Sequence, residues 1–309
     1  MCQTIKHSIL VITYNQEDTI TVAINSLLVQ KEYIYEIVIN DDCSTDNTWN
    51  VILEFQKQYP QLIKPHRNTE NLGIFLNEVN GLKSLTGDVI SLLAGDDYYI
   101  PGVFKEMNSL IYNNGFDLNN DNFILFFNHE IAYPDGKKVI IDNSLCLSGS
   151  QFKLKMRGLI GNRTIGMSKS IVTKINKIPS GLGTHSDMLL DIQFEYYANK
   201  AAYSPFIASV YNAGCGISSR TKYLDHYKSL ILNTEALKNI YSNDLDEEDN
   251  LYLSIMILSY KYCISPSLSK FVKIAFLFWK NRNCFLYRFL LIRNFKQCFF
   301  ALVISIIRK

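Results

Sequence analysis

The sequence lacks the cysteine pattern of a metal site or of a disulfide framework. Its seven cysteines contain no C-x-x-C pair and do not cluster with the five histidines. Zinc sites and disulfide-rich domains require such regular spacings, so neither is predicted, and a reducing cytosol fits best. A secretory signal is also not expected, because Met1–His7 has no apolar core and leads directly into a predicted strand.

Acidic residues and long apolar runs are missing from the C-terminal region. Residues 266–309 hold nine Lys or Arg and no Asp or Glu, a net +9 that leaves −7 for residues 1–265 of a chain carrying +2. The last largely apolar run, Cys298–Ile307, has ten residues, about half of what a transmembrane helix needs. Basic side chains interleave with aromatic ones, as in amphipathic helices on an anionic membrane. The sequence thus predicts a basic, membrane-associating tail over 266–309.

Other interpretations of this tail are open. Its helices could instead pack on the rest of the protein and keep their charges in water. Nucleic-acid binding, which interleaved basic and aromatic residues also suggest, is disfavoured because the apolar content is too high. A helical extension is predicted over 221–265, where an acidic linker, Asp244–Asp249, precedes a helix over about 251–262.

What the sequence does contain is a large hydrophobic fraction and a repeated unit. With 309 residues, 48% hydrophobic and 19% charged, the chain can form one large or two small domains. An apolar strand, a polar loop and an amphipathic helix alternate in its first third, which predicts an α/β fold with a parallel sheet. The predicted strands are Ser8–Ile12, Glu36–Ile39, Leu62–Ile63 and Val89–Leu93. The predicted helices cover about 18–30, the segment from Asp46 to Pro60, and the segment that Pro101 opens.

Each predicted strand delivers polar residues to the same edge of that sheet. In open α/β sheets, ligands bind beyond the carboxyl ends of the strands. The most distinctive of these ends is Gly95-Asp96-Asp97, a glycine followed by two adjacent acids. Such acids suit Mg²⁺ or Mn²⁺ carrying phosphate oxygens, although Gly and Asp also form ordinary polar turns.

Four segments together resemble the GT-A-fold glycosyltransferases, in particular the large inverting family 2 of nucleotide-sugar transferases. They occur in the family's order and spacing over about residues 7–105, and they are Val11–Asn15, Asn40–Asp46, Asn71–Gly73 and Gly95–Asp97. The resemblance implies a Rossmann-like nucleotide-binding sheet with helices on both faces. It also implies a catalytic domain over 1–220, with a nucleotide-sugar-binding half over 1–115 and an acceptor half over 116–220.

The resemblance implies roles for individual residues. The nucleotide sugar would be bound by loop residues, namely Thr13, Tyr14, Asn15, Asp42, Asn71, Gly73 and Asp96. Tyr14 would lie against the base and Asp42 would accept a hydrogen bond from uracil, so a UDP-sugar is the expected donor. Asp97, together with Asp96, would ligate a divalent metal, Mn or Mg, on the diphosphate.

Three departures from the family's pattern weaken the expected binding of metal and phosphate. Many members have Asp-x-Asp-Asp where this chain has Ala94 in place of the leading acid. Many also have an Arg in the helix after Asn-x-Gly, where Asn77 and Glu78 stand. A His often precedes a later Gly-Ile-Ser-like run, but Cys215 is found there, and a thiol suits a hard metal poorly. A binding-only relative at the membrane therefore stays an alternative.

An inverting transfer needs a base that deprotonates the acceptor hydroxyl. The best candidate is Asp187, which follows a Gly-rich loop and precedes a predicted helix over 188–198, where the family commonly has an acid pair. Asp187 could instead simply cap that helix. Asp191 is the runner-up, and His185 is close enough in sequence to assist.

The sequence therefore predicts a transferase for a hexosyl or N-acetylhexosaminyl group, acting with inversion from a UDP-sugar. The acceptor would be a lipid-linked or envelope glycan, as in O-antigen or capsule assembly, and the enzyme would lie on the inner face of the plasma membrane. A nucleotidyltransferase of similar sheet type is disfavoured, because the loop Thr13–Glu17 has neither the glycine nor the cation expected there.

Overall fold

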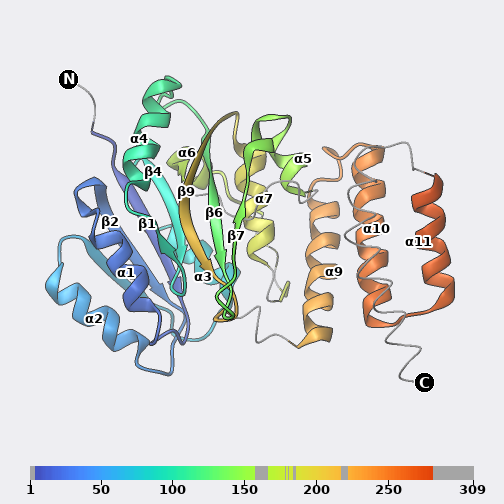
Figure 1. Ribbon diagram of the computed structural model, residues 1–309, viewed down its shortest axis with the longest axis horizontal. Coiled ribbons are helices and arrows are strands. Elements are labelled where there is room, and N and C mark those ends of the chain that lie inside the picture. The colour runs from blue at the N-terminus through green and yellow to red at the C-terminus, as the bar shows by residue number, and fades with distance from the viewer. Residues whose placement is uncertain are drawn as a thin grey trace. The chain divides into compact units, whose positions relative to one another are not determined.

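The structure is a computed structural model that describes residues 4–156, 166–177, 179, 181–183, 186–216 and 222–280. The chain divides into two compact units. Unit 1 comprises Met1–Ile178 and Ser186–Arg220, and unit 2 comprises Pro179–His185 and Thr221–Lys309. The described strands all belong to unit 1, whereas the described part of unit 2 is built from helices (Figure 1).

Unit 1 is built on one nine-stranded sheet in the order β3-β2-β1-β4-β8-β6-β9-β5, with β7 paired to β6. Its first four strands are β1 (His7–Thr13), β2 (Ile34–Asp41), β3 (Ile63–Arg67) and β4 (Val89–Ala94). They run parallel, since β1 pairs with both β2 and β4, and β2 pairs with β3. The parallel sheet predicted for the first third of the chain is confirmed.

The later strands make the sheet mixed. They are β5 (Tyr98–Tyr99), β6 (Phe123–Ala132), β7 (Lys138–Ile141), β8 (Gly166–Ser168) and β9 (Lys200–Asn212). The short β8 is antiparallel to both β4 and β6, so β6 and its parallel partner β9 run in the same direction as the first four strands. Asn212 at the end of β9 therefore reaches the same edge as the ends of β1, β2 and β4.

Helices cover both faces of the sheet. They are α1 (Ile20–Leu28), α2 (Thr48–Gln58), α3 (Ile74–Leu82), α4 (Val103–Asn113), α5 (Gln151–Met156), α6 (Lys169–Val172) and α7 (Asp187–Tyr197), with short 3-10 turns at Lys31–Tyr33 and Ser144–Leu147. Ile9 and Val11 of β1 belong to the core with α1, α2 and α4, whereas Leu10 between them belongs to the core with α3, α6 and α7. Successive strand residues point to opposite faces, so a strand covered on both sides is apolar throughout.

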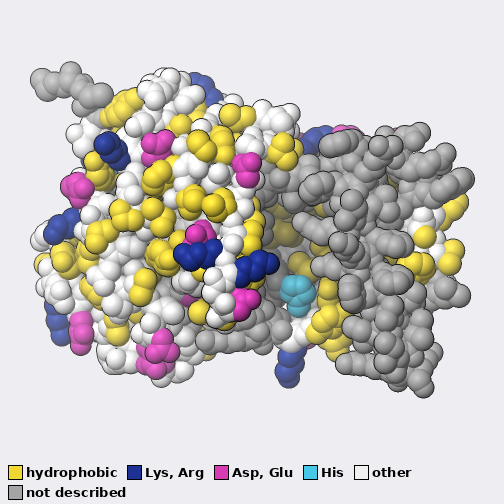
Figure 2. Space-filling view, viewed as in Figure 1, with side chains coloured by type: hydrophobic (Ala, Val, Ile, Leu, Met, Phe, Trp, Pro, Cys, Tyr) yellow, Lys and Arg dark blue, Asp and Glu magenta, His cyan; other side chains and the backbone are white. Residues whose placement is uncertain are grey.

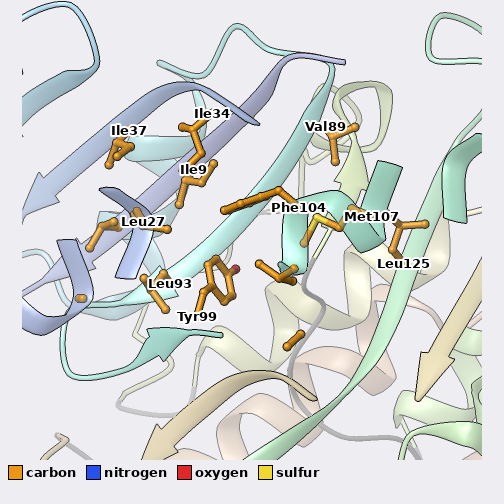
Figure 3. Packing of buried hydrophobic residues seen from close by; sticks show 14 of the residues in the cluster. Ile9, Leu27, Ile34, Ile37, Val89, Leu93, Tyr99, Phe104, Met107 and Leu125 are labelled. Atoms are coloured by element: carbon orange, nitrogen blue, oxygen red, sulfur yellow. The ribbon is translucent and has the colours of Figure 1, made fainter. Parts of the chain in front are cut away.

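The first of these two cores fixes α4 on the sheet. Figure 3 shows Met107 of α4 beside Phe104 and Leu125, and all three are completely buried. Each such side chain contributes about 1.5–3 kcal/mol through the area it removes from water. The helix begins at Val103 because Gly102, with φ +97°, occupies its N-cap position after Pro101. The helix predicted after Pro101 is confirmed.

The hairpin β6–β7 is the one that the turn Pro134-Asp135-Gly136 predicts. On its surface Lys138 Nζ pairs with Glu130 Oε1 over 2.8 Å. Figure 2 shows basic and acidic side chains next to one another, among hydrophobic ones, on this face of unit 1. Charges of opposite sign are therefore interspersed on the face shown.

Unit 2 contains α9 (Tyr223–Ile240), α10 (Glu247–Ile264) and α11 (Leu268–Lys280). The acidic linker begins α10 through a capping box, in which Asp249 N donates to Asp246 Oδ1 over 2.8 Å and Asp246 N donates to Asp249 Oδ2 over 3.3 Å. The C-terminal helices predicted from the sequence are confirmed as far as Lys280. In the described part of the chain, no helix is both long and apolar enough to cross a membrane. The basic tail beyond Lys280 lies outside the described residues.

Candidate active site

The loops that carry the candidate residues follow strands that end at one edge of the sheet. In the sheet register, Thr13 at the end of β1 is level with Asp41 of β2, and Ile12 is level with Ala94 of β4. Adjacent loops are directly bonded, since Asn15 N donates to Ser44 Oγ over 2.9 Å. The structure thus brings together the first, second and fourth strand ends, as a ligand site at this edge requires.

The acid pair Asp96–Asp97 is held by the last residue of β9. The backbone N–H of Asn212 donates to Asp97 Oδ1 over 2.9 Å, and Asn212 Nδ2 donates to the carbonyl oxygen of Asp96 over 2.6 Å. Asp96 is 6% exposed and Asp97 is 1% exposed. Both acids are therefore set in place by a residue more than 100 positions away, which no local pattern in the sequence indicates.

Gly95 is required by space. A Cβ atom at this position would lie 2.5 Å from Gln16 Oε1 and 2.9 Å from Thr13 Oγ1. These two side chains are themselves joined, because Thr13 Oγ1 donates to Gln16 Oε1 over 2.8 Å. The turn Gly95–Asp97, called the acid turn below, therefore packs against the loop after β1. The buried Thr13 forms part of that contact.

Asp42 holds the segment that leads into α3. Its Oδ1 accepts from Leu72 N over 2.9 Å and from Asn68 Nδ2 over 2.8 Å, while Oδ2 accepts from Gly73 N over 2.9 Å. Gly73 has φ +81° and ψ 164°, a region open essentially only to glycine. Asp42 is 3% exposed, and among the described residues Oδ2 has one hydrogen-bond donor, Gly73 N, so one further donor can bind there.

Asn77 belongs to a buried amide network with the same segment. Asn40 Nδ2 donates to Asn77 Oδ1 over 2.7 Å, and Asn77 Nδ2 donates back to the Asn40 carbonyl oxygen over 3.1 Å. Asn68 Nδ2 bridges Asn77 Oδ1 and Asp42 Oδ1, each over 2.8 Å. Asn77 therefore connects α3 to the end of β2. In the region where the family often has an Arg, it is linked through Asn68 to Asp42.

The other predicted nucleotide-binding residues lie in the loops at the same edge. Asn15 has φ 51°, a left-handed conformation that asparagine tolerates, and its Oδ1 accepts from Thr45 N over 2.8 Å. Tyr14 is half-buried, and Asn71 is exposed. Asp41, next to Asp42, is completely buried and pairs with Arg67 Nε over 3.1 Å. Burial raises the pKa of Asp41, which the hydrogen bonds from Ser44 oppose.

Asp187, the predicted base, is the first residue of α7 and is exposed. Asp191, one turn further, pairs through Oδ2 with Lys155 Nζ over 3.2 Å, and the lysine side chain is only 1% exposed. Helix α3 packs against α7 and carries Glu78, which is 5% exposed. Burial, followed by the negative charges of Asp191 and Asp187, holds the pKa of Glu78 well above its usual range. The structure therefore places Asp187 and Asp191 on α7, the helix that packs against the helix of Glu78.

The family model described as Glycosyl transferase family 2 matches residues 8–174. This stretch is more than half of the chain and contains all four segments singled out in the sequence. The chain belongs to glycosyl transferase family 2. Asp42, Asp96 and Asp97 lie inside the matched stretch, whereas Asp187 lies beyond its end.

Relatives and solved structures agree with the family and the fold. The chain is 28% identical to the dTDP-rhamnosyl transferase RfbG of Shigella flexneri over 202 residues, 63% of this chain and 67% of that protein. An uncharacterized protein of Mycobacterium tuberculosis is 33% identical over 132 residues, 42% of this chain and 37% of that protein. The chain thus spans little more than a third of the mycobacterial relative.

The crystal structure of S. aureus TarS 1–349 in complex with UDP-GlcNAc superposes on this chain with a TM-score of 0.63. The superposition covers 87% of this chain and 79% of that chain at 19% identity. This likeness concerns the fold, and it confirms the expected GT-A architecture.

In this family 2 member, the turn Gly95–Asp97 offers two carboxylates to a metal. No three His, Cys, Asp or Glu side chains among the described residues form a group that could hold an ion. Mg²⁺ is often bound by one or two carboxylates, with phosphate oxygens and water completing its shell. Asp96 and Asp97 therefore fit an ion that arrives with a diphosphate.

Three residues of the candidate site in this family 2 member were not found from the sequence. Asn212 and Lys155 act across distant elements, and Glu78 was noted only because the family has Arg in that region. Cys215, where a His was expected, is exposed and has a free thiol. His185 and the Gly-Ile-Ser-like run after Gly216 lie outside the described residues.

Proposed function

We propose that the glycosyltransferase moves a hexosyl or N-acetylhexosaminyl group from a UDP-sugar, with inversion, to a glycan acceptor. The observation that carries the proposal is the buried pair Asp96–Asp97, clamped by Asn212 at the edge where the loop of Asp42 also lies. The fold neighbour TarS is solved with UDP-GlcNAc, which supports this donor class. RfbG is a dTDP-rhamnosyl transferase, and thymine has the same N3–H as uracil, so Asp42 would serve either base.

The proposed reaction is a direct displacement at the anomeric carbon. The Asp187 carboxylate accepts the proton of the acceptor hydroxyl, and the acceptor oxygen forms the new bond to C1. The bond between C1 and the diphosphate oxygen breaks, and its electron pair leaves with the nucleoside diphosphate. Because attack and departure occur on opposite faces, the anomeric configuration inverts. Asp96 and Asp97 would hold a divalent ion, which when bound supplies positive charge to the leaving diphosphate.

Nucleotide release from a panel of donors tests the proposal. Purified protein is incubated with UDP-glucose, UDP-galactose, their N-acetyl forms and dTDP-rhamnose, each with Mn²⁺, Mg²⁺ or chelator. We expect release from at least one UDP-sugar, abolished by Asp97→Asn and by chelator. Asp187→Asn should lose transfer and release while keeping donor affinity, because the carboxylate acts only on the acceptor side.

Three outcomes would contradict this proposal in different ways. Release from dTDP-rhamnose alone would keep the reaction and exclude UDP as the nucleotide. Nucleotide binding without release from any donor would favour a binding-only protein. Full activity of Asp187→Asn would exclude Asp187 as the base.

The acceptor and the place of action form a second part of the proposal. We propose a lipid-linked or envelope glycan, as in O-antigen or capsule assembly, reached at the inner face of the plasma membrane through the basic tail. Support comes from the net +9 of residues 266–309 and from α11, whose Val272 and Phe276 are more than half exposed. Exposed apolar and basic side chains on one helix favour an anionic lipid surface.

Vesicle co-sedimentation tests the membrane part. The full chain should pellet with vesicles containing phosphatidylglycerol and stay in solution with phosphatidylcholine alone. The double variant Val272→Ser with Phe276→Ser should weaken that pelleting while leaving nucleotide release unchanged. Equal pelleting with both vesicle types would exclude the charge-dependent attachment.

A further inference from the structure

Arg67, the last residue of β3, is a cation at the carboxyl edge of the sheet that the proposed reaction does not use. In the sheet register it is level with Asp41, the last residue of β2. Its Nε pairs with Asp41 Oδ2 over 3.1 Å, and its Nη2 donates to the Ser44 carbonyl oxygen over 2.5 Å. Asp41 and Ser44 are buried, whereas the Arg67 side chain is 38% exposed. One guanidinium therefore reaches from the surface to both ends of the short segment that carries Asp42.

The segment between Asp41 and Ser44 forms a turn closed by its own hydrogen bonds. Cys43 within it has φ 63°, a left-handed conformation that costs free energy for a residue with a Cβ atom. The Asp41 carboxylate accepts from Ser44 N at Oδ2 over 3.1 Å and from Ser44 Oγ at Oδ1. A buried carboxylate needs a nearby positive charge to remain ionised, and Arg67 supplies that charge.

The same turn is bonded to the loop after β1. Ser44 Oγ accepts from Asn15 N over 2.9 Å, and Asp42 N donates to the Thr13 carbonyl oxygen over 2.9 Å. The two side chains proposed to bind the base, Tyr14 and Asp42, therefore lie on loops that share one set of hydrogen bonds. A displacement of Ser44 would move both loops.

The guanidinium of Arg67 is itself held by Trp49 of α2. Its Cζ lies 5.5 Å from the centroid of the indole ring, within the range of a cation–π contact. A planar guanidinium can bind a carboxylate and a carbonyl oxygen at once, whereas a lysine ammonium on a flexible stem is a point charge without this fixed geometry. The contacts therefore favour arginine over lysine at this position.

We propose that Arg67 is a positioning residue for the nucleotide, which sets the turn Asp41–Ser44 so that Asp42 and Tyr14 bind the base of the donor. This inference rests on the proposed function, in which these two residues bind the base. Because Arg67 acts through Asp41 and Ser44, it governs donor affinity and leaves the chemical step unchanged.

Calorimetry with UDP and with dTDP tests the inference. Arg67→Met should weaken nucleotide binding about tenfold, the effect expected from the loss of one charge-assisted hydrogen bond. In steady-state assays the donor KM should rise by a similar factor while kcat stays unchanged. Arg67→Lys should recover only part of the affinity, because the ammonium cannot hold Asp41 and Ser44 together.

Lys64→Met is the matched control. Lys64 lies on the same strand as Arg67 and also pairs with a buried acid of β2, Glu36, but it does so at the opposite end of the strands. The control therefore removes a comparable ion pair away from the site. Its nucleotide affinity should equal that of the wild type.

The pH dependence of UDP affinity is a readout that a purely structural role would not change. Burial raises the pKa of Asp41, the hydrogen bonds from Ser44 and the charge of Arg67 lower it, and the charge of Asp46 raises it. Without Arg67 this pKa rises further, so the carboxylate that closes the turn gains a proton at a higher pH. On acidification, the affinity of Arg67→Met should therefore fall at a higher pH than that of the wild type. A loss by the same factor at every pH would contradict the inference.

The remaining outcomes separate this inference from the proposed function. Urea unfolding first shows whether the variants are folded, and if Arg67→Met is not, Arg67→Lys decides, since wild-type affinity in it would overturn the inference. Equal nucleotide affinity in the wild type and Arg67→Met would also overturn it, as would an equal loss in Arg67→Met and Lys64→Met. A wild type that binds neither UDP nor dTDP would instead refute the proposed function.

Discussion

His7, the first residue of β1, makes the stability of unit 1 depend on pH in a defined window. The imidazole is completely buried, its Nε2 lies 2.7 Å from Asn108 Oδ1, and its ring packs 5.3 Å from that of Phe104. Nδ1 has no hydrogen-bond partner among the described residues. The neutral ring, with Nε2–H donating to Asn108, suits this site, whereas a second proton on Nδ1 would be buried without an acceptor.

The magnitude follows from the pKa of His7. Burial lowers it from 6.5 to about 4, against the opposing effects of the Asn108 hydrogen bond and the charge of Asp88. In the unfolded chain the imidazole of His7 is therefore protonated below pH 6.5, whereas in the folded chain it stays neutral down to about pH 4. Stability is fully present above the unfolded value and falls as the pH drops through this window. At 1.36 kcal/mol for each unit, the loss amounts to about 3 kcal/mol.

Urea unfolding at a series of pH values measures this loss. His7→Gln removes the titrating group and keeps a polar side chain that can reach Asn108, so all other titrations are shared by the two proteins. Between pH 6.5 and pH 4 the wild type should lose about 3 kcal/mol more of its unfolding free energy than the variant. Parallel curves for the two proteins would refute the reasoning, whatever their absolute stabilities.

Three further predictions concern the sheet and the site. Asn212→Ala removes the 2.6 Å hydrogen bond to the Asp96 carbonyl, so donor kcat/KM should fall about tenfold in steady-state assays. The free energy of unfolding should drop by only about 1 kcal/mol. An unchanged kcat/KM would contradict the role of Asn212 in holding the acid pair. Gly73→Ala forces a side chain into φ +81°, ψ 164°, so the free energy of unfolding measured in urea should fall by about 1–3 kcal/mol. Calorimetry should also show weaker UDP binding. Unaltered values of both quantities would contradict the requirement for glycine at this position. Glu36 is completely buried at the opposite ends of the strands, where it accepts hydrogen bonds from Ser8 Oγ over 2.7 Å and from Thr86 N over 2.6 Å. Glu36→Gln should therefore lower the unfolding free energy by about 2–3 kcal/mol and leave the activity per folded molecule unchanged. Loss of activity in this variant would place Glu36 in the site.

The first third of the fold was predictable because its signals are local. Each strand of β1, β2 and β4 is an apolar run of the right length, and each is followed by loop-forming residues. The helices between and after them show apolar residues at helical spacing, as in α4, where Val103, Phe104, Met107 and Ile111 are buried. Since a parallel crossover usually contains a helix between its strands, the alternation alone leads to a parallel sheet.

The second half carried weaker signals. β8 has three residues, Gly166–Ser168, too few for any periodicity, yet it turns the sheet from parallel to mixed. β9 contains Pro205, which argues against a central strand in sequence reasoning. In the structure the register of β6 and β9 shifts near this proline, and Asn128 Nδ2 donates to its carbonyl oxygen over 3.3 Å. An irregular strand thus delivers Asn212 to the acid turn.

The two sides of the site are held by different kinds of contact, and this difference predicts how each will respond to pH. On the proposed nucleotide side, backbone N–H groups and amide side chains within about thirty residues fix the carboxylate of Asp42. On the proposed acceptor side, α3, α5 and α7 supply ionisable groups that act on one another through charge, such as Glu78 and Asp191, which are more than a hundred residues apart in the chain. Amide contacts respond little to pH, whereas the second set depends on which carboxyls hold protons. Alkaline pH should therefore reduce transfer well before it weakens donor binding, and simultaneous loss of both would mean that one set of contacts supports the whole site.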